Sequence, residues 1–224
     1  MFNAIEFAET TNGGSLDIHS IPQLGIDDFR EAMIEAMSDG ARLAMLFGSQ
    51  TSDRQAVELF AVLADDDRSR LGIVRCMVSG DSYPSLTPHC PQAHLFEREI
   101  AEQFGLKPEG HPFLKPVRYR KSWVESRDAW GRSGEIAPGV TDYYRVDGDE
   151  VHEVAVGPVH AGVIEPGHFR FQCHGEEVFH LEISLGYQHR GIEETLTGGP
   201  TSRSLHLMET AAGDTTIGDR KSVV

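Results

Sequence analysis

Apolar residues recur at helical spacing in two segments of the first half of the chain. In residues 26–37 they lie three or four positions apart, with aspartates in the first turn and Gly40 just beyond the end, which predicts a helix. Its periodic residues are Ile26, Phe29, Met33, Ile34 and Met37. A second helix is predicted to begin at Pro91 and to end before Gly105, since proline suits a first helical position and glycine a C-terminal cap. The buried stripe expected on this helix consists of Ala93, Phe96, Ile100 and Phe104.

Short runs typical of β-strands lie between these helices, at residues 42–47, 57–63 and 71–78. The last two runs flank a polar turn at residues 65–68, which predicts a hairpin. A helix, three strands and a second helix together predict a small α+β domain over residues 1–117.

The pattern changes in the second half of the chain. Residues 118–149 are polar, rich in glycine, serine and charge, and read as a connector between domains. From residue 150 onward apolar and polar positions alternate. Phe169, Phe171 and Cys173 share one strand face, and His168, Arg170 and Gln172 share the other. After a turn at residues 174–176 the apolar face continues through Phe179, Leu181, Ile183 and Leu185.

This alternation predicts an antiparallel hairpin within residues 157–185, with its apolar face packed and its polar face carrying His168 and Arg170. Residues 191–208 are predicted to be helical, with an interruption at residues 198–200. The fold class expected for the whole chain is α+β, with the second domain beginning in a β-hairpin.

Composition narrows the possible partners and compartments. The 224 residues are 39% hydrophobic and 25% charged, as in ordinary globular proteins, but the net charge is −15. Such a charge argues against a general nucleic-acid or anionic-membrane surface, and residues 118–121 form the only obvious basic cluster. No apolar run approaches the ~20 residues of a membrane-spanning helix, and the N-terminus lacks the features of a signal peptide. Three widely spaced cysteines (Cys76, Cys90, Cys173) are expected to be small buried hydrophobes with reduced thiols, which indicates the cytoplasm.

Two sequence stretches in the first domain carry a family resemblance. They are HLFEREIAEQFGL at residues 94–106 and GHPFLKP at residues 110–116. Their ERE, FG and GHP elements resemble the signature of the complex I 30 kDa subunit, which implies a docking role rather than a catalytic one. On physical grounds Glu97, Arg98 and Glu99 are expected to be a helix surface that offers charges to a partner, and His111 joins them as a docking candidate.

The second domain resembles the N-terminal part of the large subunit shared by nickel–iron hydrogenases and complex I, where it is the 49 kDa subunit. Residues 157–160 (GPVH) resemble the GPxH that opens the quinone-pocket hairpin of complex I. Residues 165–170 (EPGHFR) resemble the hydrogenase version, and residues 187–191 (YQHRG) the YxHRG common to both. The resemblance implies proton handling by Glu165 and His168, because partial burial can raise a carboxyl pKa toward neutrality. It implies a cavity lined by His160, Arg170, His189, Arg190 and Glu209.

The sequence departs from the hydrogenases where their first metal-binding cysteines stand. Ala212 and Thr215 occupy those positions, and neither side chain can replace a thiolate on nickel. A second cysteine pair would come from a C-terminal segment that this chain does not contain. The eleven histidines show no HxxxH spacing that would suggest another metal site. We therefore expect no directly bound metal or cofactor, electrons supplied by iron–sulfur clusters of partner subunits, and a quinone as a possible ligand.

A fusion of these two modules is typical of formate hydrogenlyase-type and hydrogenase-related complexes and of some complex I subunits. The resemblance implies a peripheral subunit, on the cytoplasmic side of the membrane, of a complex I-like energy-converting oxidoreductase such as NADH dehydrogenase. This subunit would be inactive alone, with an iron–sulfur small subunit and membrane antiporter-like subunits as partners and no nucleic acid. Two alternatives remain: an active nickel–iron hydrogenase large subunit, and a non-catalytic docking subunit.

The C-terminal residues prompt a separate expectation. Residues 150–218 would be only the first part of a large-subunit domain, which family members continue with further helices. The ending DRKSVV at residues 219–224 is what GAT CGG AAG AGC GTC GTG would encode, and this string resembles a short-read sequencing adapter. We expect residues 219–224 to be a non-native tail, and the second domain to be poorly soluble because its apolar hairpin face would lack packing partners.

Overall fold

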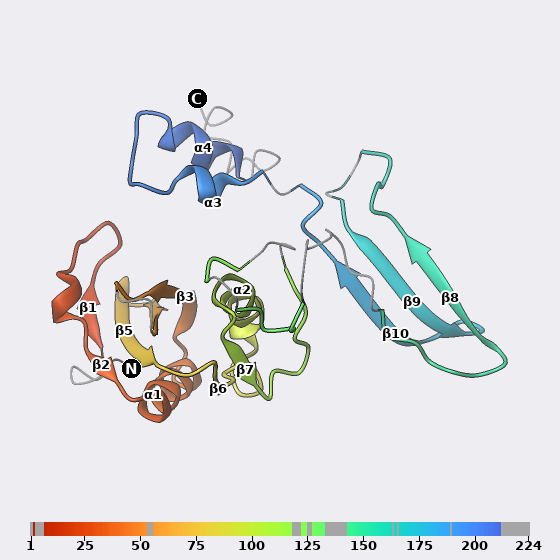
Figure 1. Cartoon of the computed structure of the whole chain (residues 1–224), viewed down its shortest axis with the longest axis horizontal. Helices are drawn as coiled ribbons and strands as arrows, with labels where there is room; N and C mark the ends of the chain where they lie inside the picture. The colour runs from red at the N-terminus through yellow and green to blue at the C-terminus, as the bar shows by residue number, and fades with distance from the viewer. Residues whose placement is uncertain are drawn as a thin grey trace. The chain divides into compact units, whose positions relative to one another are not determined.

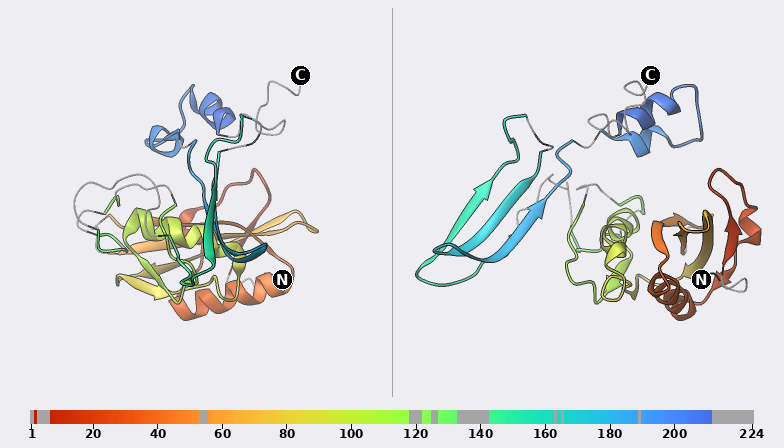
Figure 2. Two further views of the ribbon diagram at one scale, coloured as in Figure 1. Left: turned by 90° about the vertical axis from the view of Figure 1, so that its right-hand side faces the viewer. Right: turned by 180° about the vertical axis from the view of Figure 1, so that it is seen from behind.

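The computed structural model describes residues 2, 7–52, 56–117, 122–124, 127–132, 143–162, 164, 166–188 and 190–211. The chain forms two compact units, Met1–Thr141 and Asp142–Val224, each of which is described by itself. Helices and several sheets make the fold a mixed α+β one, as predicted (Figures 1 and 2). Within the described ranges no helix is long and apolar enough to cross a bilayer.

The first unit is built on a five-stranded sheet. Its main path runs in the order β1 (Ala8–Thr10), β5 (Arg70–Val78), β4 (Val57–Asp65) and β3 (Arg42–Gln50), all antiparallel. The short β2 (Gln23–Leu24) pairs in parallel with β5 and follows a 3₁₀ turn, η1 (Ile18–Ser20). The predicted hairpin is confirmed as β4–β5. Asp65 closes its turn, since its carboxylate accepts the backbone N–H of Arg68 and pairs with the Arg68 guanidinium at 2.9 Å.

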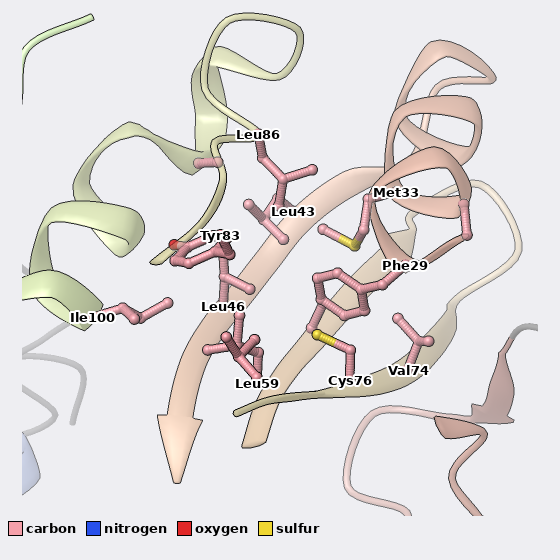
Figure 3. Close-up of a cluster of buried hydrophobic side chains, with 14 of the residues drawn as sticks. Phe29, Met33, Leu43, Leu46, Leu59, Val74, Cys76, Tyr83, Leu86 and Ile100 are labelled. Atoms are coloured by element: carbon pink, nitrogen blue, oxygen red, sulfur yellow. The ribbon is translucent and has the colours of Figure 1, made fainter. Parts of the chain in front are cut away.

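Helix α1 (Ile26–Ser38) covers one face of this sheet and forms the core with it (Figure 3). It buries Phe29, Ala32, Met33 and Ala36, close to the predicted apolar stripe. Facing residues such as Leu59, Val74 and Cys76 have no solvent exposure. Full burial of each large apolar side chain contributes about 1.5–3 kcal/mol, so this contact is a substantial part of the stability of the unit.

The second predicted helix is a 3₁₀ turn, η2 (Pro91–Ala93), that continues into α2 (His94–Phe104). Gly105 ends it in the left-handed conformation (φ 62°), and a Cβ there would lie 2.6 Å from Cβ of Arg127. Of the predicted stripe, Ala93, Ile100 and Phe104 are buried, whereas Phe96 is only partly buried. Two short strands, β6 (Ser82–Pro84) and β7 (Lys107–Glu109), pair in parallel beside the helix.

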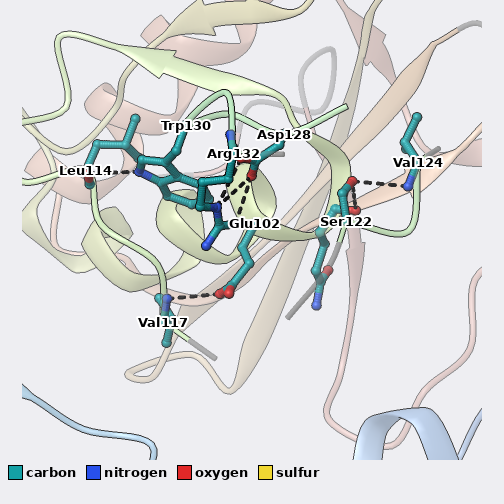
Figure 4. Close-up of polar contacts among 9 residues, drawn as sticks. Glu102, Leu114, Val117, Ser122, Val124, Asp128, Trp130 and Arg132 are labelled. Atoms are coloured by element: carbon teal, nitrogen blue, oxygen red, sulfur yellow. Dashed lines mark hydrogen bonds and ion pairs between the residues drawn. The ribbon is translucent and has the colours of Figure 1, made fainter. Parts of the chain in front are cut away.

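The segment that the sequence assigns to a connector, residues 118–149, is divided between the two units. In its first part, the Ser122 hydroxyl and the Trp123 N–H both donate to the carbonyl of Gln103 on α2, and the Trp130 indole donates to the carbonyl of Leu114 (Figure 4). Its last part, residues 143–149, belongs to the second unit.

The second unit contains a three-stranded antiparallel sheet in the order β10 (Glu177–Ser184), β9 (His168–His174) and β8 (Val151–Val156). The predicted hairpin is confirmed as β9–β10, and β8 adds a strand that we had not predicted separately. Two short helices follow, α3 (Ile192–Thr195) and α4 (Ser204–Thr210), and the interruption predicted at residues 198–200 lies between them.

The alternation of faces in this sheet is confirmed, but the prediction of which face is covered is wrong. Gln172, Glu182 and Ser184 on the polar face are at most 5% exposed, whereas Leu181 and Ile183 on the apolar face are each 44% exposed. The reason is that residues 143–147, called the strap below, lie on the polar face. Alternation reveals two chemically different faces, but it does not say which of them another segment covers.

Candidate functional site

The charged triplet on α2 was expected to form a surface for a partner, and for Glu97 this expectation is wrong. Its side chain has no solvent exposure. The carboxylate accepts hydrogen bonds from the hydroxyls of Ser85 and Thr87, both at 2.6 Å, and from the backbone N–H groups of Leu86 and Thr87 at 2.8 and 3.0 Å. Four donors satisfy the buried charge, so Glu97 fastens the loop after β6 to the helix.

Arg98 also points into the unit rather than toward a partner. It is 9% exposed and donates to the carbonyls of Lys115 and Pro116 at 2.7 and 3.0 Å. One turn further on, the buried carboxylate of Glu102 accepts the N–H of Val117 at 2.9 Å (Figure 4). Glu99 is partly exposed and accepts from the Gln103 amide. The charged side chains of α2 therefore mainly bind the segment that follows β7. A contact of Glu99 or His111 with a partner protein stays a prediction.

His111 joins the turn after β7 to the start of α2. Its Nδ1 accepts the N–H of Phe113 at 3.1 Å, so Nε2 carries the proton and donates to the carbonyl of His94, also at 3.1 Å. Burial lowers the pKa of His111 and, together with the nearby Arg98 charge, that of His94. The neutral imidazole fits this arrangement, because a protonated Nδ1 could not accept from Phe113.

In the second unit, two of the predicted site residues close the loop 157–168, which joins β8 to β9. Nε2 of His160 lies 2.8 Å from the carbonyl oxygen of Gly167, and Nδ1 of His168 lies 3.4 Å from that of Gly157. Gly157 has φ +86°, and a Cβ there would lie 2.8 Å from Nε2 of His160, so only glycine leaves room for this closure. The resulting structure holds two imidazoles at the base of one loop.

A polar network continues from this loop along the covered face of the sheet. Arg170, the third predicted site residue in this region, forms a two-point ion pair with Glu153 on β8, and the Gln172 amide donates to the same carboxylate at 2.6 Å. The ring of Tyr143 in the strap lies over the guanidinium of Arg170 at 4.3 Å and 5.7 Å from the ring of His168. Burial by itself would raise the pKa of Glu153. The hydrogen bonds from Arg170 and Gln172 together outweigh burial and lower this pKa. Glu153 therefore stays ionised and fixes Arg170.

Glu153, Gln172 and Tyr143 were not among the predicted site residues. The alternation that placed Arg170 and Gln172 on a polar face was the available signal for this network. It did not identify β8, the strand that supplies Glu153, and nothing in the sequence of the strap indicated that it would lie on that face.

The remaining predicted site residues are not part of this cluster in the described parts of the chain. Glu165 and His189 lie outside the described residues, as do Ala212, Thr215 and residues 219–224. Arg190 is exposed after β10, and Glu209 on α4 contacts His206 of its own helix at 3.6 Å. A cavity shared by His160, Arg190 and Glu209 stays a prediction. In the described residues, no group of three or more His, Cys, Asp or Glu side chains could hold a metal ion.

The first unit also carries an open polar groove of about 450 Å³ beside the β6–β7 pair. Most of its charges already have partners: Arg132 pairs with Asp128 at 2.8 Å, and Lys107 lies 3.4 Å from Glu109. The groove is lined by Asp81, Ser82, Gly105, Lys107, Glu109, Arg127, Asp128 and Ala129. Its polar walls provide no apolar anchor of the kind that small-molecule sites use, so it is a minor candidate.

Comparison with known proteins identifies the class of the first unit. Residues 26–129 match the family described as "Respiratory-chain NADH dehydrogenase, 30 Kd subunit". This part of the chain is a complex I 30 kDa subunit domain, as its ERE, FG and GHP elements predicted. The matched range extends to residue 129 and so includes Ser122, Trp123 and other residues after position 117 that pack on α2.

Individual relatives extend the comparison into the second unit. Hydrogenase-4 component G and formate hydrogenlyase subunit 5, both of Escherichia coli (strain K12), are each 30% identical to this chain, over 166 and 169 residues. These alignments cover 68% and 69% of this chain and 30% of each relative. The C/D subunit of the NADH-quinone oxidoreductase of Buchnera aphidicola subsp. Baizongia pistaciae (strain Bp) is 32% identical over 136 residues, covering 50% of this chain and 23% of that protein.

The chain therefore spans less than a third of the length of these curated relatives. The 68% that aligns with component G is about 152 of 224 residues, which exceeds the 141 residues of the first unit. The similarity to that protein thus includes residues of both units.

Proposed function

We propose that this chain is a peripheral subunit of a complex I-like, membrane-associated, energy-converting oxidoreductase, in which it couples electron transfer to proton handling on the cytoplasmic side. One observation carries the proposal: a single polypeptide joins a 30 kDa subunit domain to the loop 157–168, and relatives from such oxidoreductases align across both units. Electrons would reach this assembly through iron–sulfur clusters of partner subunits, among them a small subunit, and membrane antiporter-like subunits would complete it.

The geometry of the loop supports a role in proton handling. Each imidazole uses one nitrogen to close the loop, His160 through Nε2 and His168 through Nδ1, which leaves its second nitrogen for proton exchange. Arg170, fixed by Glu153, places a permanent positive charge beside His168 on the same strand face. Glu165 would supply the carboxylate of this site, and a quinone is the electron acceptor that the two imidazoles would face.

Co-expression with the iron–sulfur small subunit of the same assembly tests the proposal. Affinity purification through this chain should yield a stoichiometric complex that contains iron and sulfide and transfers electrons from added dithionite to a short-chain quinone. Purification of the chain without that small subunit would overturn the proposal.

A double variant separates the catalytic role from the docking alternative. His160→Ala with His168→Ala should leave the complex assembled and abolish quinone reduction, whereas Val159→Ala, an exposed neighbour in the same loop, should change neither. An assembled complex whose activity is unaffected by the double variant would establish a docking role instead.

Metal analysis distinguishes the proposal from the hydrogenase alternative. Because Ala212 and Thr215 cannot supply thiolates, the purified complex should contain no stoichiometric nickel and should not take up hydrogen. Cysteines introduced at these two positions should not create hydrogenase activity, since a second cysteine pair and the diatomic ligands of iron would still be needed. Nickel at one equivalent, with hydrogen uptake, would show that the enzyme is an active hydrogenase.

A further inference from the structure

The floor of the open polar groove in the first unit is the outer face of the β6–β7 pair. Tyr83 and Pro108 are paired across the two strands, and both are buried. Because side chains alternate along a strand, the neighbours Ser82, Lys107 and Glu109 point outward, and all three line the groove. The burial of the opposite face therefore fixes this polar floor, which cannot turn inward without exposing Tyr83.

The wall of the groove is the turn that begins at Arg127, and its own contacts hold it in place. The Asp128 carboxylate accepts the backbone N–H of Arg132 at 2.6 Å and pairs with the guanidinium of this residue at 2.8 Å (Figure 4). The same guanidinium lies 4.8 Å from the centre of the Trp130 ring. At its start the wall lies against Gly105, where only glycine leaves room for it. Wall and floor are thus formed by the unit itself, and a preformed groove lowers the entropic cost of binding.

Most of the charged groups around the groove neutralise one another. The neutralising pairs are Lys107 with Glu109 at 3.4 Å and Asp128 with Arg132 at 2.8 Å. Within the described parts of the chain, neither the Asp81 carboxylate nor the Arg127 guanidinium has an ionic or hydrogen-bonding partner. Asp81 is exposed just before β6, whereas Arg127 is half-buried in the wall. The groove therefore presents a negative charge from its floor and a positive charge from its wall, and water screens the half-buried charge less.

We propose that this groove docks an extended segment of a partner subunit, whose carboxylate side chain pairs with Arg127 and whose cationic side chain pairs with Asp81. The inference rests on the proposed function, which supplies the partner subunit. A polypeptide suits the groove better than a small molecule does, because the lining offers charges and hydrogen-bonding groups but no apolar anchor. A guanidinium can bind a carboxylate through two parallel hydrogen bonds, so Arg127 would orient the segment and Asp81 would fix its other end.

Charge complementarity makes the preference of the groove specific. A segment with two acidic side chains would place one of them against Asp81, and a segment with two basic side chains would place one against Arg127. An uncharged segment would leave the half-buried guanidinium of Arg127 without a partner. The groove should therefore select segments that carry both charges, and its affinity for them should fall when the ionic strength is raised from about 50 to 500 mM.

A panel of short capped peptides tests the chemistry of the groove on the full chain. Peptides that carry one aspartate and one lysine at varied spacing are compared with doubly acidic, doubly basic and uncharged ones. The unchanged chain should bind a peptide with both charges about tenfold more tightly than the uncharged one. Arg127→Glu should change the preference to doubly basic peptides, and Asp81→Lys should change it to doubly acidic ones. Glu31→Lys, at an exposed position outside the groove lining, should keep the original preference. Equal binding of charged and uncharged peptides by the unchanged chain would overturn the proposal.

Photo-cross-linking in the purified complex identifies the occupant. With p-benzoylphenylalanine in place of Ser82, light should link the groove to a partner subunit, at a segment that holds an acidic and a basic residue. The same group in place of Glu31 should not label that segment. An assembled complex with no cross-link from position 82, or with a cross-link only to this chain, would overturn the proposal and leave the proposed function intact. Purification of the chain without its small subunit would instead refute the proposed function, and the peptide panel, which needs no partner, would still decide the specificity of the groove.

Discussion

The buried carboxylate of Glu97 allows a quantitative test of how the first unit is held together. In Glu97→Gln the shape of the side chain is kept, but an amide group takes the place of one carboxylate oxygen. Oε2 accepts from the Thr87 N–H and from two hydroxyls, whereas Oε1 accepts only from Leu86. The hydroxyls can rotate to accept from the new amide, but the Thr87 N–H cannot.

The magnitude follows from the hydrogen bonds that are lost. The Thr87 N–H keeps only the longer contact of 3.2 Å with the Ser85 hydroxyl oxygen, and the charge that strengthened the other hydrogen bonds is lost, so Glu97→Gln should cost about 2–4 kcal/mol of unfolding free energy. Ser85→Ala, which removes one of the four donors and leaves the charge satisfied by three, should cost about 1–2 kcal/mol. Glu31→Gln, the same chemical change at an exposed position of α1, should stay within about 0.5 kcal/mol of the unchanged chain.

Urea unfolding followed by tryptophan fluorescence provides the measurement. Both tryptophans, Trp123 and Trp130, belong to the first unit, so the signal reports on this unit. The midpoint for Glu97→Gln should fall by about 1 M or more, with an unchanged slope. A shift no larger than that of Glu31→Gln would refute the reasoning, because a carboxylate with four buried donors cannot be replaced without cost.

Three other predictions concern titratable groups and one glycine. Because burial holds the pKa of His111 below its ordinary value of 6.5, the stability it contributes is complete above that pH and is lost as the pH falls through the lowered pKa. Acid unfolding of the first unit should therefore begin below about pH 6.5 and should be shallower in His111→Asn. Burial raises the pKa of the Cys76 thiol to about 12 and that of Cys90 to about 11, so iodoacetamide at pH 8 should alkylate them only as fast as the unit unfolds. Gly157→Ala should break the hydrogen bond that closes the loop 157–168 and lower the melting temperature of the second unit, whereas Gly162→Ala, with φ +71° and open space around its Cβ, should cost only about 1–2 kcal/mol.

Each of these predictions has a contradicting outcome. An identical acid transition in His111→Asn would show that protonation of His111 does not contribute to acid unfolding. Alkylation of Cys76 or Cys90 at the rate of a free thiol, in chain that circular dichroism shows to be folded, would mean that neither thiol is buried. Equal melting temperatures for Gly157→Ala and Gly162→Ala would show that the loop is not closed through His160.

The local elements of this fold could be predicted from the sequence because each is encoded by neighbouring residues. Periodicity placed α1, the β4–β5 hairpin and the β9–β10 hairpin, and Gly105 marked the end of α2. The short strands β1, β2, β6 and β7 were missed, since two or three residues are too few to show a period. They form because distant segments supply their partners.

The burial of Glu97, which the sequence analysis did not predict, is compatible with the helical periodicity of α2. Positions 93, 97, 100 and 104 are spaced by four, three and four, so Glu97 stands within the buried stripe and Phe96 at its edge. Its charge suggested a surface position, although Ser85 and Thr87 lie close upstream as potential donors. For the second unit, His160, His168 and Arg170 came together as neighbours of one loop and strand. Their contacts with Tyr143 and Glu153 depend on how the strap folds back, which alternation does not encode.

The order of strands in the first unit has a consequence for synthesis on the ribosome. β3, β4 and β5 are adjacent both along the chain and in the sheet, and β1 and β2 pair with β5. The described hydrogen bonds that hold the following segment on α2 come from Val117, Ser122 and Trp123. Every partner of the first unit among the described residues has therefore been translated before β8 begins, and mostly local contacts favour rapid folding. A nascent chain would thus carry a folded N-terminal unit at the time when its apolar sheet leaves the exit tunnel. Chaperones that recognise exposed hydrocarbon would then meet one sheet face, rather than an entire unfolded polypeptide.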